Sequence, residues 1–331
     1  MKAIVQDSYG LPNVLHLRDI DRPLIGDDDV LVRVHAAGVD SGVWHLTAGL
    51  PYLVRLMGLG LRTPKRRVPG MDVAGRVEAV GRNVAHVGPG DEVFGACGPT
   101  GDGSFAEFAS VPAGRLTPKP ANITFEQAAA VPVSGVTALQ GLRDKGRVLP
   151  GQKVLVIGAG GGVGTFAVQL AKAFGAEVTG VCGPTKTDLV RSLGADHVID
   201  YTRENFADGA RRYDLILDNA GRRPLSVLRR ALAPRGTLVI VGGEGGNPWS
   251  GGFGRQILRA PLLSLVVSQT LLSLTADVRT RDLDVLGRLI EGGKVTPVID
   301  RTFPLAQAPE AIRYVHDGRA RGKVVVSVAE D

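Results

Sequence analysis

The chain has 331 residues, of which 44% are hydrophobic and 22% are charged, as in an ordinary globular protein. This length exceeds what one hydrophobic core usually serves, so we expect two domains. The formal net charge is +6, but the lysines and arginines are scattered. Their largest cluster, Lys65-Arg66-Arg67, has no interleaved aromatic residues, so we do not expect a nucleic-acid-binding protein.

Neither the cysteines nor the apolar segments indicate a secreted or membrane protein. Cys97 and Cys182 lie far apart, which excludes a disulfide framework and a four-cysteine zinc lobe. The N-terminus enters a strand without an apolar signal core. Residues 260–276 carry no charge over 17 positions, but this stretch is short for a membrane span. We expect it to be a packed helix that lines a pocket or a subunit contact, in a cytoplasmic protein that binds no membrane.

Residues 1 to about 120 predict a small, mostly antiparallel β-domain. β-Branched residues alternate or cluster between turn signals such as Tyr9-Gly10 and Gly26-Asp27. The one longer helical pattern lies near 44–61. We expect strands at 2–5, 14–17, 30–36, 73–80, 92–95 and 105–111.

A proline-containing linker at 118–123 leads into a region where strands and helices alternate. Thr124 is a plausible N-cap for the first helix. Alternation of this kind predicts a doubly wound parallel sheet. We expect helices at 134–145, 186–193 and 225–232, and strands at 197–199, 214–217 and 237–241. The chain then ends with helices at 281–291 and 306–317 and strands at 298–303 and 323–328.

Residues 153–183 have the pattern of a βαβ unit that binds a dinucleotide. An apolar strand at 154–157 precedes a glycine cluster and a helix that ends at Gly175. The match to G-x-G-x-x-G is not literal, because its three positions are Ala159, Gly161 and Gly164. The order of strand, turn, helix and strand still predicts that backbone N–H groups of the turn bind a pyrophosphate. The alternative is a glycine-rich turn that binds nothing.

The end of the second strand, Val181-Cys182-Gly183-Pro184-Thr185-Lys186, bears on the choice of cofactor. NAD-selective proteins usually place an acid here, but this stretch has none, and Glu177 lies at the opposite end of the strand. Lys186 provides a point charge that suits a 2′-phosphate. We therefore predict NADPH, the alternative being that Lys186 is only a solvated lysine that opens the next helix.

Several short motifs occur at coherent spacing along almost the whole chain. They are Pro69-Gly70-Met71-Asp72-Val73-Ala74-Gly75, Pro89-Gly90-Asp91-Glu92-Val93, Ala130-Val131-Pro132, the glycine turn at 158–164, and Arg321-Gly322-Lys323-Val324-Val325. Together they resemble the medium-chain dehydrogenase/reductase superfamily, and within it the zinc-independent quinone oxidoreductase branch. The resemblance implies an α/β protein and a homodimer. A GroES-like β-rich catalytic domain would span 1–122, completed by 297–331, and a Rossmann domain would span 123–296.

The residues that hold catalytic zinc in other branches of this family are missing. Those relatives use a cysteine in the segment matching 38–43, a histidine matching Met71 and a cysteine matching the region of Ser134. Neither a thioether nor a hydroxyl replaces these ligands in an open tetrahedral site, and His35 and His45 lack paired ligands. We expect no metal. Without a Lewis acid, alcohol oxidation is not expected, whereas hydride addition to an enone or quinone needs only hydrogen bonds to a distant oxygen.

Two residues are catalytic candidates under this resemblance. Asp40 matches an asparagine of the family's nicotinamide pocket. An ionised carboxylate there would repel an enolate, so Asp40 would bond the nicotinamide ribose or be protonated in an apolar pocket; the alternative is a turn residue after Gly38. Tyr52 lies one residue from a position where relatives use tyrosine as a hydrogen-bond or proton donor, and is otherwise a loop aromatic. Apolar residues that follow either wall the substrate mouth or pack on the domain: Leu53, Leu56, Met57, Leu59 and Leu61.

The motif positions also imply a set of cofactor contacts. Two of them have plain structural alternatives, since Thr137 could cap local backbone and Lys323 could be a solvated strand charge. The implied contacts are Thr137 near the nicotinamide ribose, Gly161, Gly162 and Val163 at the pyrophosphate, Gly183 and Lys186 at the adenosine phosphate, Tyr201 near the adenosine, Asn219 beside the nicotinamide, and Gly243 and Lys323 in later segments.

The predicted function is an NADPH-dependent, metal-free reductase that transfers hydride to a quinone or an α,β-unsaturated carbonyl. An enoyl-thioester reductase is the alternative enzyme, and a functional Tyr52 with acylated-carrier binding near Lys65-Arg66-Arg67 would favour it. A non-catalytic NADPH-binding sensor or scaffold is the alternative from another class.

Overall fold

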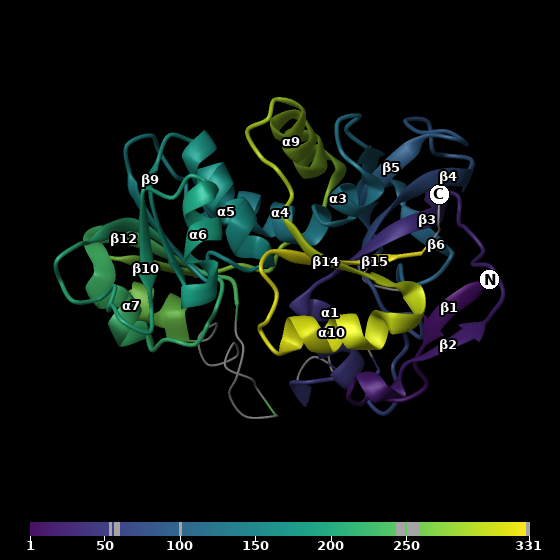
Figure 1. The fold of residues 1–331 in the computed structure, drawn as a ribbon, viewed down its shortest axis with the longest axis horizontal. Coiled ribbons are helices and arrows are strands. Elements are labelled where there is room, and N and C mark those ends of the chain that lie inside the picture. The colour runs from purple at the N-terminus through teal and green to yellow at the C-terminus, as the bar shows by residue number, and fades with distance from the viewer. Residues whose placement is uncertain (53–54, 56–59, 99–100, 243–248, 250–258, 329–331) are drawn as a thin grey trace. The chain divides into compact units, whose positions relative to one another are not determined.

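The computed structural model describes residues 1–52, 55, 60–98, 101–242, 249 and 259–328, which fold as an α/β protein (Figure 1). The chain divides into two compact units. Unit 1 comprises Met1–Val136, Asp277–Gly293 and Pro297–Asp331, and unit 2 comprises Thr137–Ala276 and Lys294–Thr296. The last segment of the chain therefore returns to the unit that the first segment begins.

Unit 1 is built on the mostly antiparallel sheet that the strand pattern predicts. Its strands are β3 (Asp29–Val39), β4 (Asp72–Val80), β5 (Glu92–Ala96), β6 (Phe108–Pro112), β7 (Leu116–Pro118), β14 (Ile299–Pro304) and β15 (Lys323–Ser327), and β1 (Lys2–Val5) pairs separately with β2 (His16–Asp19). Among the described residues the order is β14-β15-β3-β4-β5-β7, with β6 also on β3. β3 lies at the centre because Val30, Val32 and Val34 are fully buried.

Short helices complete unit 1. They are α1 (Ser41–Ala48), α3 (Phe125–Ala129), the start of α4 (Pro132–Leu139), α9 (Thr280–Glu291) and α10 (Ala308–His316), with 3₁₀ turns at Pro12–Val14, Ala113–Arg115 and Leu305–Gln307. Thr124 caps α3 as predicted, because its hydroxyl accepts a hydrogen bond from the Gln127 amide and the Gln127 side chain accepts one from the Thr124 amide. α9 buries Leu283, Leu286 and Ile290 on one face.

The boundary between the units differs from the one expected from the sequence. Residues 123–136 and 277–293, expected in the Rossmann domain, belong to unit 1. Hydrogen bonds hold α9 there: Thr117 Oγ1 donates to Asp284 Oδ1 at 2.5 Å, and Thr280 Oγ1 donates to the Leu116 carbonyl at 2.9 Å. α9 therefore packs against β7, at the edge of the unit 1 sheet.

Unit 2 contains the doubly wound parallel sheet that the sequence predicts. Its strands are β8 (Lys153–Ile157), β9 (Glu177–Cys182), β10 (His197–Asp200), β11 (Tyr213–Asp218), β12 (Leu232–Ile240) and β13 (Thr270–Ser273). Among the described residues the order is β10-β9-β8-β11-β12-β13, all parallel. The winding direction changes between β8 and β11, which is where such sheets bind ligands. The helices are α5 (Gly162–Ala173), α6 (Thr187–Ser192) and α7 (Leu225–Ala231), with a 3₁₀ turn at Pro184–Lys186 and a π-helical extension of α4 at Gln140–Lys145.

The expectation of one packed helix at 260–276 is wrong. Helix is confined to 259–264 of the described residues, and Thr270–Ser273 forms β13 at the edge of the sheet, paired with β12 from Thr237↔Thr270 onward. The Ser264 side chain explains the stop, since its hydroxyl accepts from the Leu271 amide at the start of the strand. Apolar composition alone does not separate a short helix followed by a buried strand from one longer helix.

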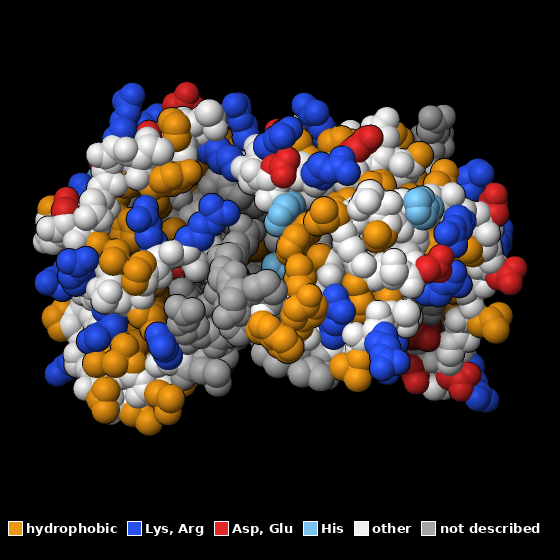
Figure 2. Space-filling view, turned by 90° about the horizontal axis from the view of Figure 1, so that it is seen from below, with side chains coloured by type: hydrophobic (Ala, Val, Ile, Leu, Met, Phe, Trp, Pro, Cys, Tyr) orange, Lys and Arg blue, Asp and Glu red, His pale blue; other side chains and the backbone are white. Residues whose placement is uncertain are grey.

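The surface carries its charges in mixed sign. On the described part of the face drawn in Figure 2, lysine and arginine side chains are interspersed with apolar and acidic ones, without a continuous basic stripe. Both cysteines are free and buried. No helix among the described residues has the length and apolar character needed to cross a bilayer.

Candidate functional site

The glycine-rich turn of unit 2 presents backbone N–H groups at the carboxyl end of β8. α5 begins at Gly162, and its N-cap, Gly161, makes no side-chain cap hydrogen bond. First-turn amides such as those of Gly162 and Val163 have no acceptor within the helix. A Cβ on Gly164 would lie 2.1 Å from the Gly158 carbonyl oxygen, so only glycine permits this close approach of helix and strand. The turn has the form of an anion cradle.

Three predicted adenosine-end residues lie together beside this cradle. The aliphatic stem of Lys186 lies on Gly160, where an added Cβ would be 2.8 Å from Lys186 Cβ. Tyr201 is 53% exposed, and its hydroxyl would be 3.5 Å from a Cβ on Gly183. Glu177 begins β9, so the strand's carboxyl end has no acid of its own. An exposed ring and a lysine therefore flank the turn.

Asn219 lies at the point where the strand order reverses. It follows β11, and a Cβ on Gly158, after β8, would lie 3.6 Å from Asn219 Cβ. Both polar atoms of the Asn219 side chain are buried without a hydrogen-bond partner among the described residues. An unpaired buried amide is costly, so a partner from a bound ligand is the simplest explanation for an asparagine here.

Asp218, which sequence reasoning missed, shapes the turn that holds Asn219. Its Oδ1 accepts hydrogen bonds from the amides of Ala220 and Gly221 at 3.2 and 3.0 Å, while its Oδ2 has no partner among the described residues. Burial raises the pKa of this carboxyl to about 6, against the opposing effect of the two amides and Arg223. The sequence offered one signal for Asp218, an acidic residue at the end of the apolar run of β11.

Unit 1 contains a buried polar cluster of Lys323, Asp40, Asp72 and Ser134, here called the cation cluster. Lys323 Nζ donates to Asp40 Oδ1 at 2.5 Å, to Asp72 Oδ2 at 3.1 Å and to Ser134 Oγ at 3.2 Å. Ser134 Oγ donates to Asp40 Oδ1 at 2.8 Å, and the Val133 amide donates to Asp72 Oδ1 at 2.8 Å. β3, β4, α4 and β15 supply or border these groups, which come from four distant parts of the sequence.

The charged groups of the cation cluster shift one another's pKa values. Burial and the neighbouring Asp40 raise the pKa of Asp72 well above its usual range. Burial opposes ionisation of Asp40 too, but Lys323 and the hydrogen bonds it receives lower its pKa. Burial opposes the charge of Lys323, and the two carboxylates outweigh it and raise the lysine pKa. Asp40 and Lys323 thus favour each other's charged forms, whereas Asp72 is pushed toward its neutral form.

The cation cluster corrects two expectations from the sequence. Lys323 is 1% exposed, so the alternative of a solvated strand charge is wrong. Its ammonium donates to three oxygens of unit 1, and the predicted cofactor contact of Lys323 stays a prediction. Asp40 is not protonated in an apolar pocket either, because an ammonium and a hydroxyl face it.

The residues of the cation cluster do not suit a catalytic zinc ion. The cluster offers oxygen atoms that already surround a fixed positive charge. Catalytic zinc needs three protein ligands of the nitrogen, sulfur or carboxylate type, without another cation among them. Met71 contributes no ligand, because its methyl group packs where a Cβ on Gly42 would be, 2.8 Å away. Among the described residues, no group of three or more His, Cys, Asp or Glu side chains is arranged to hold a metal.

Other predicted residues remain predictions. Tyr52 is 38% exposed, and the guanidinium of Arg55 lies 4.8 Å from its ring centre. Thr137 is buried within α4. Leu61 is 65% exposed. Gly243 and the apolar residues Leu53, Leu56, Met57 and Leu59 lie outside the described residues.

Within the basic cluster Lys65-Arg66-Arg67, only the middle residue is buried. Arg66 is 7% exposed, and its guanidinium donates to the carbonyls of Gly70, Gly98 and Gly101. The Arg67 guanidinium pairs with Asp7 at 2.7 Å. Arg66 thus supports surrounding backbone, whereas Lys65 and Arg67 are exposed, and binding of an acylated carrier near this cluster stays a prediction.

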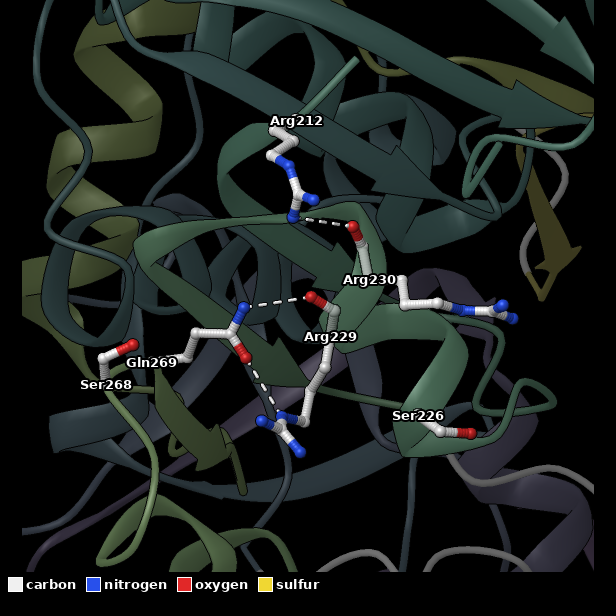
Figure 3. Close-up of a pocket in the computed structure, with 6 residues that line it drawn as sticks. All are labelled: Arg212, Ser226, Arg229, Arg230, Ser268 and Gln269. Carbon is white, nitrogen blue, oxygen red and sulfur yellow. Dashed lines mark hydrogen bonds between the residues drawn. The ribbon is translucent and has the colours of Figure 1, made fainter. Parts of the chain in front are cut away.

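A hollow of unit 2 with a volume of about 640 Å³ is lined by polar and basic side chains (Figure 3). Arg212 precedes β11 and Gln269 precedes β13, so this hollow is at the amino ends of the parallel strands. Arg229 Nε donates to Gln269 Oε1, and Gln269 Nε2 donates to the Arg229 carbonyl. Ligands of doubly wound sheets bind at the carboxyl ends, so the nucleotide site is assigned to the cradle. The lining residues are Arg212, Ser226, Arg229, Arg230, Ser268 and Gln269.

Comparisons with known proteins agree with this geometry. The family model described as alcohol dehydrogenase GroES-like domain matches residues 26–121, and the one described as zinc-binding dehydrogenase matches residues 193–326. The chain is 34% identical to the mouse (Mus musculus) mitochondrial NAD(P)H oxidoreductase RTN4IP1, over 99% of this chain and 89% of that protein. It is 35% identical to a chloroplastic NADPH-dependent alkenal/one oxidoreductase of Arabidopsis thaliana, over 98% and 79%. A quinone oxidoreductase structure from Coxiella burnetii matches with a TM-score of 0.87 and 28% identity, covering 99% of each chain.

A GroES-like unit combined with a Rossmann-like unit and a dinucleotide cradle defines a nicotinamide-dependent oxidoreductase. The chain belongs to the medium-chain dehydrogenase/reductase superfamily, as its motifs indicated.

Proposed function

We propose that this protein is an NADPH-dependent, metal-free reductase that transfers hydride to a quinone or an α,β-unsaturated carbonyl compound. Relatives named as a quinone oxidoreductase and as an alkenal/one oxidoreductase support this acceptor class. The observation that carries the proposal is the Lys323 ammonium, which occupies the centre of the buried cation cluster where a divalent metal would have to sit.

The residues of unit 2 fit a dinucleotide. Gly161, Gly162 and Val163 would hold the pyrophosphate on backbone amides, and the buried, unpaired amide of Asn219 would bond the nicotinamide end. When bound, the reduced nicotinamide supplies the hydride. Lys186 favours a 2′-phosphate. The carboxyl end of β9 carries no acidic residue, so β9 itself places no negative charge against that phosphate.

The chain's part in the reaction is to bind, orient and stabilise charge. Hydride addition to a conjugated carbonyl moves negative charge to its oxygen, which hydrogen bonds can stabilise without a Lewis acid. Asp40, ionised beside Lys323, serves as an acceptor for a hydroxyl such as that of the nicotinamide ribose and not as a proton donor. Tyr52 is the proposed proton donor, since a phenol at a partly exposed site can exchange its proton with water.

NADPH oxidation followed at 340 nm separates this proposal from its alternatives. We expect turnover with 9,10-phenanthrenequinone. Turnover confined to crotonyl-CoA would point instead to an enoyl-thioester reductase, and NADPH binding without turnover of either compound would point to a sensor or scaffold. Tyr52→Phe should lower kcat with little change in the affinity for NADPH; an unchanged kcat would remove Tyr52 from the mechanism.

We also propose that the protein is a homodimer joined at the edge of the unit 2 sheet. Among the described residues, β13 is the edge strand of this sheet, and a sheet edge can accept another strand. Close to it in sequence, Leu262, Leu265 and Val266 are 68%, 82% and 79% exposed, and large apolar side chains gathered on a surface often mark a protein contact. Light scattering after size exclusion should give twice the chain mass, and Leu265→Glu should shift the mass toward that of one chain. A monomeric wild-type protein would contradict this proposal.

A further inference from the structure

We propose that the arginine-lined hollow of unit 2 binds a soluble small molecule that carries two or more phosphate groups. Its volume is about 640 Å³, a size typical of small-molecule sites. The site would lie within unit 2 alone. It would bind its ligand whichever acceptor the enzyme reduces and whichever nicotinamide cofactor it uses, so the test needs no catalytic readout.

The hollow and the glycine-rich cradle lie at opposite ends of the parallel sheet. Arg212 directly precedes β11, Arg230 lies just before β12, and Gln269 directly precedes β13, so the hollow is at the amino ends of these strands. The cradle follows the carboxyl end of β8, which runs parallel to β11. A molecule in the hollow would therefore be a second ligand and not a part of the dinucleotide.

Three arginines bring positive charge to the hollow without a countercharge. Arg212 and Arg230 are exposed and Arg229 is half-buried, and the residues that line the hollow include no aspartate or glutamate. None of the three arginines forms an ion pair with a described residue, whereas Lys172 of the same unit pairs with Asp196 at 2.8 Å. The carboxyl end of α7 offsets only about half an elementary charge. The hollow is therefore complementary to an anion.

Hydrogen bonds within the hollow use only part of what these arginines can donate. Arg212 Nη1 donates to the carbonyls of Arg230 and Leu232, and Arg229 Nε donates to Gln269 Oε1 (Figure 3). The other N–H groups of these two guanidiniums, and all those of the Arg230 side chain, make no hydrogen bond to a described residue. Arg212 and Arg229 are thus held in place with N–H groups left to bind phosphate oxygens, which a guanidinium can do in a bidentate manner.

The separation of the three charges favours a ligand with more than one phosphate group. In Figure 3 the Arg229 guanidinium lies beside Gln269, the Arg212 guanidinium lies beside the Arg230 carbonyl, and the Arg230 guanidinium lies apart from both. A single phosphate would leave part of this charge without a partner, whereas a chain of phosphates or a molecule phosphorylated at two positions would not. None of the lining residues is aromatic, so the bases of a single-stranded nucleic acid would find no stacking surface.

The test is the binding of inorganic tripolyphosphate and inorganic orthophosphate to the full-length, cofactor-free protein, measured by isothermal titration calorimetry. We expect a site whose Kd for tripolyphosphate is about tenfold below that for orthophosphate, since each further phosphate adds charge-assisted hydrogen bonds. Arg230→Gln should raise the tripolyphosphate Kd about tenfold. It should leave the melting temperature unchanged, because the Arg230 side chain makes no hydrogen bond to a described residue.

Two control variants should leave the tripolyphosphate Kd unchanged. Lys186→Ala alters the cradle, and Arg191→Gln removes an arginine of the same unit that pairs with Asp188 at 3.1 Å. A loss in Lys186→Ala as large as in Arg230→Gln would overturn the proposal, because the probe would then occupy the cradle. An equal loss in Arg191→Gln would overturn it too, because binding would then follow net charge alone.

An unchanged tripolyphosphate Kd in Arg230→Gln, or equal Kd values for the two phosphate probes, would likewise contradict the proposal. Sedimentation with vesicles of equal parts phosphatidylcholine and phosphatidic acid distinguishes a soluble ligand from a lipid headgroup. We expect the protein to stay in the supernatant. Sedimentation that Arg230→Gln abolishes, without tripolyphosphate binding in solution, would assign the hollow to a membrane surface and overturn the proposal of a soluble ligand.

Discussion

In unit 1 the Lys323 ammonium donates hydrogen bonds to Asp40, Asp72 and Ser134, whereas in unit 2 the side-chain amide of Asn219 has no partner among the described residues. The polar atoms of both groups are buried, but only the ammonium is saturated with hydrogen bonds. A saturated ammonium has its hydrogen bonds and countercharges supplied by the fold itself, so its loss is expected to cost stability. A buried polar group without a partner lowers the stability of the ligand-free protein. A ligand that supplies the missing hydrogen bond restores that free energy. Saturation, more than burial, separates a folding element from a binding site here.

The largest expected effect comes from breaking the saturated cluster. Lys323→Met keeps an apolar stem but leaves Asp40 and Asp72 without their cation, so the free energy of unfolding should fall by about 3–5 kcal/mol. Urea denaturation measures it. Lys119→Met should lose less, because its partner Glu92 is 35% exposed and can be solvated. Equal losses of unfolding free energy in the two variants would show that the cation cluster contributes no more to stability than the partly exposed Lys119 ion pair.

Asp218 should make the stability of unit 2 depend on pH. Its pKa rises from 3.8 to about 6 on folding, so folding favours the protonated acid. No penalty exists below pH 3.8, and the penalty grows as pH rises through 6, to at most about 3 kcal/mol. Asp218→Asn should therefore be more stable than the wild type at pH 8 and lose this advantage toward pH 4. A difference independent of pH, in urea unfolding at several pH values, would contradict the shift.

Lys186→Ala should separate the two nicotinamide cofactors. Removing a charge-assisted contact to the 2′-phosphate should raise the Kd for NADPH about ten- to a hundredfold and change the Kd for NADH little. Fluorescence titration of each cofactor measures the difference. Lys172→Ala is the control, because Lys172 pairs with Asp196 at 2.8 Å within the same unit. Equal losses for NADPH and NADH would remove Lys186 from cofactor selection.

The smallest effect is expected from the side-chain amide of Asn219. Here NADPH affinity and the melting temperature of the cofactor-free protein should respond differently. Asn219→Ala should raise the Kd for NADPH about three- to tenfold without lowering the melting temperature of the cofactor-free protein. Asn205→Ala should do the reverse, since Asn205 Oδ1 already accepts from the Ala207 amide at 3.1 Å. A destabilised Asn219→Ala variant with unchanged NADPH affinity would show that this amide has a structural role.

Local patterns predicted most of the fold but not its long-range polar pairings. The strand, glycine turn and helix at 153–183 predicted the parallel sheet because those signals are adjacent in sequence. The ion pair of Lys323 was not predicted, because nothing local shows that Asp40, 283 positions earlier, reaches its ammonium. Asp72 carried a usable signal, a charged residue that directly precedes the apolar residues Val73 and Ala74 at the buried start of β4. That α9 falls in unit 1 was not predicted for a related reason, since its partner Thr117 is 167 positions away.

The most direct test of the account measures metal content and activity on one preparation. Dialysed against a chelator and assayed for metals by mass spectrometry, the protein should contain substoichiometric zinc and should still oxidise NADPH with 9,10-phenanthrenequinone at its original rate. Stoichiometric zinc in the active protein, with activity abolished by chelation and restored by added zinc, would contradict the claim that hydride transfer here needs no metal.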